Sequence, residues 1–285
     1  MLNIKGLKKI AFKYLQTMED MDMDNIVFYA RTVQANAIKV LLDSIKEVID
    51  ETVIFIDENG FKIVQMDGSQ SVLVHVKLDA DSFTLFECPE PTTISLDIRY
   101  MQKMIKTIAN KDTLVLMVTK DQTDMLQIIV ENEERNKKVT SRLRLASFQE
   151  KRMEIPPEKY VSVVRIKSNE FQRYCRDLSN IADDVTIKVD DDLFSLKASG
   201  DIGDQTIELG ENEDAISFEQ RSDNMIEAKY NLKFLTLFAR SSNLCSEVQI
   251  LMKKDRPLIL LYRIGDIGEL KYVLAEKIEP SEFDD

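Results

Sequence analysis

The stretch SNEFQRYCRDLSNIADDV, residues 168–185, combines an amphipathic helical pattern with a basic row. Its apolar side chains recur at spacings of three and four, which places them on one face of a helix: Phe171, Cys175 and Leu178. Arg173 and Arg176 lie on a different face, and no acidic residue shares their row. Because the chain as a whole is acidic, this row indicates a helix that faces a polyanion.

The composition is that of an ordinary soluble globular protein. The chain has 285 residues, of which 44% are hydrophobic and 31% are charged, enough for one large domain or two medium ones. With 38 Lys and Arg against 50 Asp and Glu, the formal net charge is −12, which argues against non-specific nucleic-acid binding by the surface as a whole. A single face can nevertheless have the opposite sign.

Residues that could carry chemistry are few. The three cysteines are widely spaced and form no C-x-x-C pair, which predicts free thiols in a reducing, intracellular compartment: Cys88, Cys175 and Cys245. The single histidine, His75, lies in an alternating pattern and is expected to be a strand residue. There is no phosphate-binding loop, G-x-S-x-G motif or Cys/His metal spacing. We therefore expect no enzymatic activity, no catalytic residue, no metal and no cofactor. We also find no signal peptide and no apolar run long enough to span a membrane.

Hydrophobic periodicity divides the chain into two similar halves. Helices are expected at residues 34–49 and 98–109 in the first half and at 169–178 and 231–241 in the second. The expected strands are 27–32, 53–56, 61–64, 72–78, 83–87, 114–119, 125–130, 139–145, 161–166, 185–189, 194–198, 206–209, 215–218, 225–230, 248–252, 258–263 and 269–274. Turns are expected at 57–60 (DENG) and 190–192 (DDD), and we read the latter as a turn and not as a metal site.

The order of these segments predicts five regions. They are an N-terminal extension (1–25), a first domain (26–145), a connector that contains Pro156 and Pro157 (146–160), a second domain (161–275) and an acidic tail (276–285). The extension is either a partly ordered terminus or an amphipathic segment that docks on a partner.

The two domains have the pattern of an internal duplication. Lys39 and Lys103 are 64 residues apart, as are Arg176 and Arg240. Lys39 and Arg173 are 134 residues apart, as are Lys106 and Arg240. Equal offsets between basic residues of the helices indicate a repeated unit with a repeated task.

Basic charge is concentrated on the four expected helices. They hold nine basic residues and five acidic ones, whereas acidic residues are in excess in the chain as a whole. The basic set is Lys39, Lys46, Arg99, Lys103, Lys106, Arg173, Arg176, Lys233 and Arg240. One such helix could be an ordinary solvated face with salt bridges, but four with the same bias favour contact with a phosphate backbone. No aromatic interleaving or recognition motif accompanies the cations, so sequence-independent binding of double-stranded DNA is expected.

Several motifs resemble one family. The stretch 168–185, the tripeptide Gln65-Met66-Asp67, Ile155-Pro156 and the segment LKYVLAEKIE at 270–279 are similar to the proliferating cell nuclear antigen family of DNA sliding clamps. The resemblance runs from about residue 26 to residue 279. It implies an α+β chain of two similar clamp domains, each with antiparallel sheets packed on two helices, and a closed ring of three chains.

The resemblance also implies site residues. The inner-face cations of the family match Lys39, Lys46, Lys103, Lys106, Arg173, Arg176, Lys233 and Arg240. The strands that pair between chains match residues 139–145 of one chain and 201–209 of the next. A groove for partner peptides of the form Gln-x-x-aliphatic-x-x-aromatic-aromatic matches Met66, Leu73, Ile155, Pro156, Pro257, Leu274 and Ala275. Implied partners are DNA polymerase, an ATP-driven clamp loader and other replication and repair proteins, in the nucleus or at a viral replication site.

Some positions depart from the family pattern. Val273 stands where the family has a pocket tyrosine, and Glu276 where it has a proline. Asp191 stands where eukaryotic clamps present a lysine for ubiquitin, and residues 1–25 have no counterpart. These departures favour a viral or otherwise divergent clamp. A subunit of a heteromeric checkpoint-type clamp and a processivity factor that does not close a ring stay as alternatives.

Overall fold

A computed structural model describes residues 23–148, 159–212, 215–222 and 224–277, and the fold is α+β, as predicted. The first half contains β1 (Ile26–Thr32), α2 (Ala35–Ile45), β2 (Glu51–Asp57), β3 (Gly60–Met66), β4 (Val72–Asp79), β5 (Leu85–Glu87), β6 (Thr92–Asp97), α3 (Ile98–Ile105), β7 (Thr113–Thr119), β8 (Gln122–Asn132) and β9 (Lys137–Arg144). The second contains β10 (Ser162–Lys167), α4 (Ser168–Leu178), β11 (Asp184–Asp190), β12 (Leu193–Gly200), β13 (Gly203–Gly210), β14 (Ile216–Gln220), β15 (Ile226–Asn231), α5 (Leu232–Ala239), β16 (Glu247–Met252), β17 (Leu258–Ile264) and β18 (Gly268–Leu274). Short 3₁₀ turns lie at η1 (Met23–Asn25), η2 (Ala80–Ser82) and η3 (Arg240–Asn243).

The strands form three antiparallel sheets. Two belong to one half each, in the orders β5-β1-β7-β8-β9 and β13-β12-β11-β15. The third has nine strands in the order β14-β10-β16-β17-β18-β4-β3-β2-β6 and crosses from one half to the other where β18 pairs with β4. Each half therefore supplies one five-stranded and one four-stranded layer, in the same strand order.

Backbone register supports the duplication. Arg31 pairs with Val115 across β1 and β7, and Arg165 pairs with Gln249 across β10 and β16, with each residue 134 positions after its counterpart. The N-caps of α3 and α5 repeat as well. Asp97 accepts hydrogen bonds from the backbone N–H of Arg99 and Tyr100, and Asn231 accepts one from Lys233.

Three of the four helices, α2, α3 and α5, are shorter than predicted, whereas α4 matches its expected end at Leu178. α2 ends at Ile45 and α3 at Ile105, each four residues before the expected end, and α5 gives way to η3 at Arg240. The chain after each helix still buries apolar residues in turns, so periodicity alone extended the helices. Strand β6 was not predicted, because its Thr-rich stretch buries only Ile94 and Leu96.

The hairpin between β2 and β3 needs its glycine. Gly60 has φ +124°, and a Cβ there would lie 2.0 Å from the Leu78 carbonyl oxygen. Asp191, in the equivalent hairpin of the second half, also has positive φ, in agreement with the expected turn.

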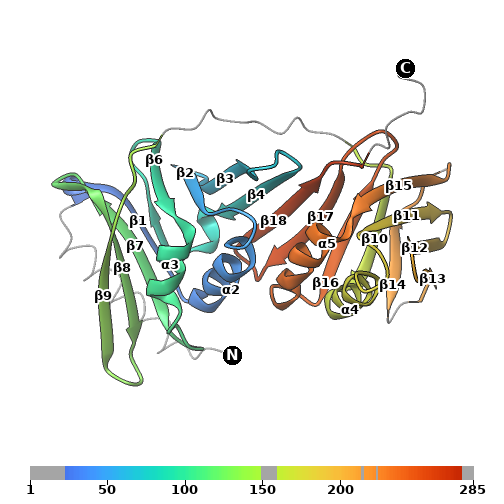
Figure 1. The fold of residues 1–285 in the computed structure, drawn as a ribbon. Helices are drawn as coiled ribbons and strands as arrows, with labels where there is room; N and C mark the ends of the chain where they lie inside the picture. Colours follow the sequence, from blue (N-terminus) through green and yellow to red (C-terminus); the bar gives the residue numbers. More distant parts are fainter. Residues whose placement is uncertain (1–22, 149–158, 213–214, 223, 278–285) are drawn as a thin grey trace, which may run out of the picture.

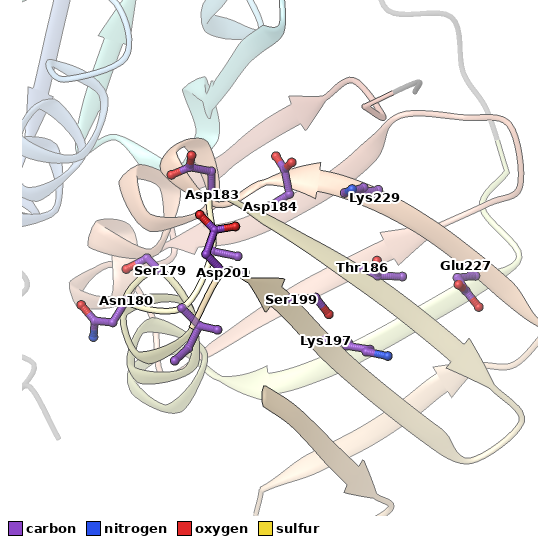
Figure 2. Close-up of a pocket in the computed structure, with 13 residues that line it drawn as sticks. Ser179, Asn180, Asp183, Asp184, Thr186, Lys197, Ser199, Asp201, Glu227 and Lys229 are labelled. Atoms are coloured by element: carbon purple, nitrogen blue, oxygen red, sulfur yellow. The ribbon is translucent and has the colours of Figure 1, made fainter. Parts of the chain in front are cut away.

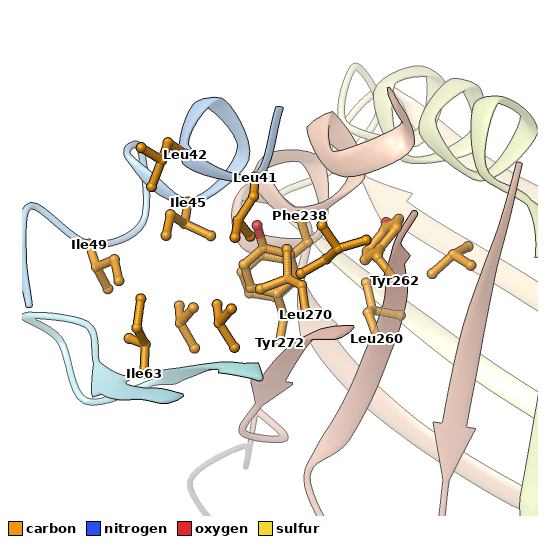
Figure 3. Packing of buried hydrophobic residues seen from close by; sticks show 14 of the residues in the cluster. Leu41, Leu42, Ile45, Ile49, Ile63, Phe238, Leu260, Tyr262, Leu270 and Tyr272 are labelled. Carbon is orange, nitrogen blue, oxygen red and sulfur yellow. The ribbon is translucent and has the colours of Figure 1, made fainter. Parts of the chain in front are cut away.

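The core is continuous between the halves. Phe238 of α5 stacks on Tyr272 of β18 with ring centroids 4.3 Å apart. Figure 3 shows Leu41 and Ile45 of α2 beside the ring of Tyr272, so side chains from both halves share one apolar layer. Burial of this layer is the main stabilising contribution. It fixes the four helices in a row, in the order α3, α2, α5, α4, on one side of the sheets (Figure 1).

Candidate functional site

The exposed side of the helix row carries the cations that the sequence analysis singled out. Each helix turns its apolar face to the sheets, as Met101 and Ile105 do in α3, and its polar face outward. Lys103, Lys106 and Lys233 are exposed. The Lys103 Nζ also lies 5.2 Å from the centre of the Tyr100 ring, a cation–π contact.

The two cations of the α2 region, Lys39 and Lys46, both interact with other groups of the protein. The Lys39 Nζ donates a hydrogen bond of 3.0 Å to the carbonyl oxygen of Ile108, just beyond α3. The Lys46 Nζ lies 2.9 Å from Asp43 Oδ1, an oxygen that also accepts a hydrogen bond from Gln102 of α3. The Lys39 hydrogen bond joins α2 to the turn after α3, whereas the Lys46 ion pair lies within the α2 region. Because both lysines have partners on the protein, they are less free to meet an external anion.

The arginine row on α4 is not clear of acids. Arg173 pairs with Glu170, and Arg176 lies 3.4 Å from Asp177, so the expectation of an isolated basic row is wrong in this respect. The arginine side chains are 53% and 68% exposed. Exposed ion pairs of this kind are weak, on the order of 0–1 kcal/mol, so a phosphate can compete for the guanidinium groups.

One cation spans the two halves. Arg240 of η3 lies 3.9 Å from Glu47, which follows α2, and both side chains are about half exposed. Arg99 belongs to a different cluster, with Asp97 and Asp50, at the first turn of α3. The structure thus brings the eight cations predicted to bind DNA onto one row of helices. They differ in how strongly each one interacts with groups of the protein itself.

The predicted peptide groove is placed only in part. Met66 and Leu73 are directly opposite each other on β3 and β4, and Leu73 is opposite Val273 on β18. These three half-buried side chains share the sheet face that points away from the helices. Ile155 and Pro156 lie outside the described residues.

The other groove candidates differ in exposure. Leu274 is 2% exposed and faces the core, so its side chain is not presented at this surface. Pro257 and Ala275 are exposed; the Pro257 carbonyl oxygen accepts a hydrogen bond from the Tyr160 hydroxyl, and the Ala275 N–H donates one to Ser71.

The apolar row continues beyond the predicted residues. Val273 is opposite Ile259 on β17, which is opposite Leu251 on β16. Sequence reasoning missed Ile259 and Leu251, because their signal is a strand-to-strand register that no single segment contains.

A polar depression of about 660 Å³ lies in the second half (Figure 2). It is bordered by the turn after α4 and by the outer faces of β11, β12 and β15. Asp183, Asp184 and Asp201 are at one end, Lys197 and Lys229 lie beside Thr186, and Glu227 lies beyond them at the other end. Its acids disfavour phosphate, and it lies off the basic helix face.

The edge strands β9 and β13 have no further strand beside them within the described residues. β9 is an edge of the five-stranded sheet of the first half, and β13 is an edge of the four-stranded sheet of the second half. Most residues of both strands are exposed. An exposed edge offers unpaired backbone donors and acceptors to another strand. Within the described ranges, no cluster of three His, Cys, Asp or Glu could hold a metal ion, and no helix is long and apolar enough to cross a membrane.

Comparisons with known proteins agree with this architecture. Residues 27–154 match the N-terminal domain of proliferating cell nuclear antigen, and residues 154–277 match its C-terminal domain. The chain is also 30% identical over 259 residues to the probable DNA polymerase sliding clamp 1 of Paramecium bursaria Chlorella virus 1, which covers 90% of this chain and 98% of that protein.

The chain belongs to the proliferating cell nuclear antigen family.

Membership confirms the family resemblance and the two-domain fold. The likeness to a viral protein agrees with the expectation of a viral or divergent clamp. The domain limits and the DNA and peptide contacts stay predictions, because a family match does not test individual residues.

Proposed function

We propose that this protein is a DNA sliding clamp whose chains close head to tail, three to a ring, around duplex DNA. The observation that carries the proposal is the row of four helices on one side of the chain. These helices carry cations at repeat-related positions on their exposed faces, although the chain as a whole is acidic. A ring held by topology and diffuse charge can slide, because Lys and Arg contact phosphates without reading bases.

The inner surface of the ring consists of the helix row. The most available cations are Lys103, Lys106, Arg173, Arg176 and Lys233, since each is exposed. Arg240 belongs with them, because it is 54% exposed and its ion pair with Glu47 is 3.9 Å long. Lys39 and Lys46 complete the surface, but they share their charge with protein groups. The acidic excess lies elsewhere and keeps DNA away from the rest of the ring.

The outer sheet face serves as the tether. Met66, Leu73 and Val273 form an apolar row that suits the aliphatic and aromatic side chains of a short partner peptide. Pro257 and Ala275 are exposed near it, and the family resemblance adds Ile155 and Pro156, which lie outside the described residues. Polymerase, clamp loader and repair proteins are the proposed partners.

The clamp works without catalysis of its own and without a cofactor. It acts by holding other enzymes on DNA, as a processivity factor, in the nucleus or at a viral replication site.

Threading on end-labelled DNA tests this function with the protein alone. A linear duplex is fixed to a bead at one end, and its free end is either open or blocked by a bulky protein before the clamp is added. A closed ring threads on and slides off only through the open end, so the clamp should occupy the DNA at equilibrium only when that end is open. Equal retention on both substrates would show a binder that does not encircle DNA.

A matched pair of variants tests the basic face. Replacing Arg173 and Arg176 by Ala should shorten retention and flatten its salt dependence, by about 0.9 in log–log slope for each phosphate that is no longer neutralised. Replacing Lys197 and Lys229, which border the polar depression, removes the same charge from another surface and should leave retention unchanged. Equal effects of the two pairs would contradict the assignment.

A further inference from the structure

The sheet face that carries the apolar row also carries a group of cations. Side chains of one strand return to the same face at every second residue. At positions two or four residues from the apolar row, this face of β3, β4, β18 and β17 holds Lys62, Lys77, Lys271 and Arg263. A strand rises about 3.3 Å per residue, so these four cations, the outer basic patch, lie roughly 7 to 13 Å from the row.

The strand register brings two of these cations together. Lys62 of β3 is directly opposite Lys77 of β4. Like charges at directly opposed positions destabilise an antiparallel pair, so this arrangement does not serve the fold. Lys77 lies 2.6 Å from Asp79, and both side chains are about half exposed. Lys62 has no ion-pair partner within the described part of the chain.

The acids of the patch balance only part of its charge. Glu269 of β18 is shared, because it pairs with Lys271 and also lies 3.6 Å from Arg263 of β17. Four cations therefore share two carboxylates, those of Asp79 and Glu269. This is the reverse of the chain as a whole, whose formal net charge is −12. The patch thus presents local positive potential to an external anion.

His75 responds to this potential. It lies on the same face of β4, directly opposite Lys271. Burial, followed by the charges of Lys271 and Lys62, lowers its pKa to about 4; Lys77 acts in the same direction and Glu269 in the opposite one. Cations from three different strands therefore act on one point of the surface.

We infer that the outer basic patch binds an acidic segment of the same partner peptides that fill the apolar row. The inference rests on the proposed peptide contact and specifies its partner: a Gln-x-x-aliphatic-x-x-aromatic-aromatic motif with Asp or Glu residues beside it. An extended peptide covers about 3.3 Å per residue, so acids two to four residues from the motif reach the cations.

Two other acidic molecules fit the patch less well. The chain's own acidic tail begins beside a different sheet, because Lys277 donates its N–H to the Lys229 carbonyl oxygen and its Nζ lies 2.5 Å from Asp184. DNA carries closely spaced phosphates, which would meet Asp79 and Glu269 among the cations. The side chains of a peptide can instead be spaced to avoid these two acids.

Peptides that share one motif and differ in their flanks test the inference. Three aspartates, three serines or three lysines are placed either before or after the motif, and binding is followed by fluorescence anisotropy. In about 50 mM salt, aspartates on at least one side should tighten binding about fivefold relative to serines, and lysines should weaken it. In about 0.5 M salt the difference should shrink to within about twofold, because exposed charges are screened.

Charge reversal assigns the preference to the patch. The double variant Lys62→Glu, Lys77→Glu should bind the lysine-flanked peptide more tightly than the aspartate-flanked one, and the serine-flanked peptide within about twofold of the wild type. The double variant Lys197→Glu, Lys229→Glu makes the same change of charge beside the polar depression and should keep the wild-type order.

The outcomes separate this inference from the proposed function. A serine-flanked peptide that does not bind would contradict the peptide contact itself, and the inference with it. If that peptide binds but aspartates give no advantage, or if their advantage survives the reversal of Lys62 and Lys77, the patch has another role and the groove stands. Weaker retention on DNA in this variant, with the peptide preference unchanged, would assign the patch to nucleic acid and also overturn the inference.

Discussion

The hydroxyl of Tyr272 donates a hydrogen bond to the main-chain carbonyl oxygen of Ser44, 3.2 Å away. Tyr272 belongs to β18 of the second half and Ser44 to α2 of the first. The Ser241 hydroxyl lies 2.9 Å from the same Tyr272 oxygen and must act as donor, because the tyrosine proton is directed at Ser44. All three groups are buried, and burial raises the pKa of Tyr272 above its ordinary value.

Replacing Tyr272 by Phe should lower the free energy of unfolding by about 1–3 kcal/mol, because it leaves the Ser44 carbonyl and the Ser241 hydroxyl without this partner. Urea denaturation at one fixed protein concentration measures the change. Tyr262 is the matched control: it is also fully buried, but its hydroxyl has no hydrogen-bond partner in the described part of the chain. Tyr262→Phe should be close to neutral, and equal losses in the two variants would contradict the role given to Tyr272.

The stability of the protein should fall as the pH drops below that of neutral solution. Burial, followed by the charges of Lys271 and Lys62, lowers the pKa of His75 from 6.5 to about 4. Since the unfolded chain then binds a proton that the folded chain does not, about 2 kcal/mol of stability should be lost between pH 7 and pH 5.

The variant His75→Gln isolates this effect. It keeps a polar strand residue but removes the titrating group, so its stability should change less than that of the wild type over the same range. Parallel curves for the two proteins would contradict the assignment to His75.

Alanine substitutions of Lys39 and Arg176 should have opposite effects on stability and on DNA retention, although both residues belong to the basic face. Lys39→Ala should destabilise the protein by about 1 kcal/mol, since it removes the hydrogen bond to the Ile108 carbonyl, and should alter DNA retention little. Arg176→Ala should do the reverse, because that side chain is 68% exposed. Thermal unfolding and bead retention, measured on both variants, check this ordering.

The apolar row should be the peptide contact. Leu73→Asp places a charge between Met66 and Val273 and should weaken binding of a Gln-x-x-aliphatic-x-x-aromatic-aromatic peptide by at least tenfold in fluorescence anisotropy. Thr186→Asp, on the outer face of β11, is the control and should bind the peptide as the wild type does. Unchanged binding by Leu73→Asp would place the groove elsewhere.

The sequence was informative where local pattern decides structure. Phe171, Cys175 and Leu178 were predicted to be the buried face of one helix, and all three are at most 1% exposed. Lys39 and Arg173 are separated by the same 134 residues as Lys106 and Arg240, and this equality indicated the duplication. The offset is constant because corresponding helices occupy the same place in the two halves.

Features that depend on contacts between distant segments escaped it. The hydrogen bond from Lys39 to the Ile108 carbonyl joins residues 69 positions apart, and the burial of Leu274 follows from its register with Val72. The extension of the apolar row to Ile259 needs the order of β18 and β17 in the sheet. Periodicity describes one segment at a time and cannot supply these relations.

Multi-angle light scattering over a range of protein concentrations tests the ring most directly. Three chains of 32.9 kDa should give a particle of about 99 kDa that does not grow as the concentration rises, because a closed ring leaves neither β9 nor β13 exposed. A mass near that of one chain at every concentration, or a mass that increases without limit, would contradict the account.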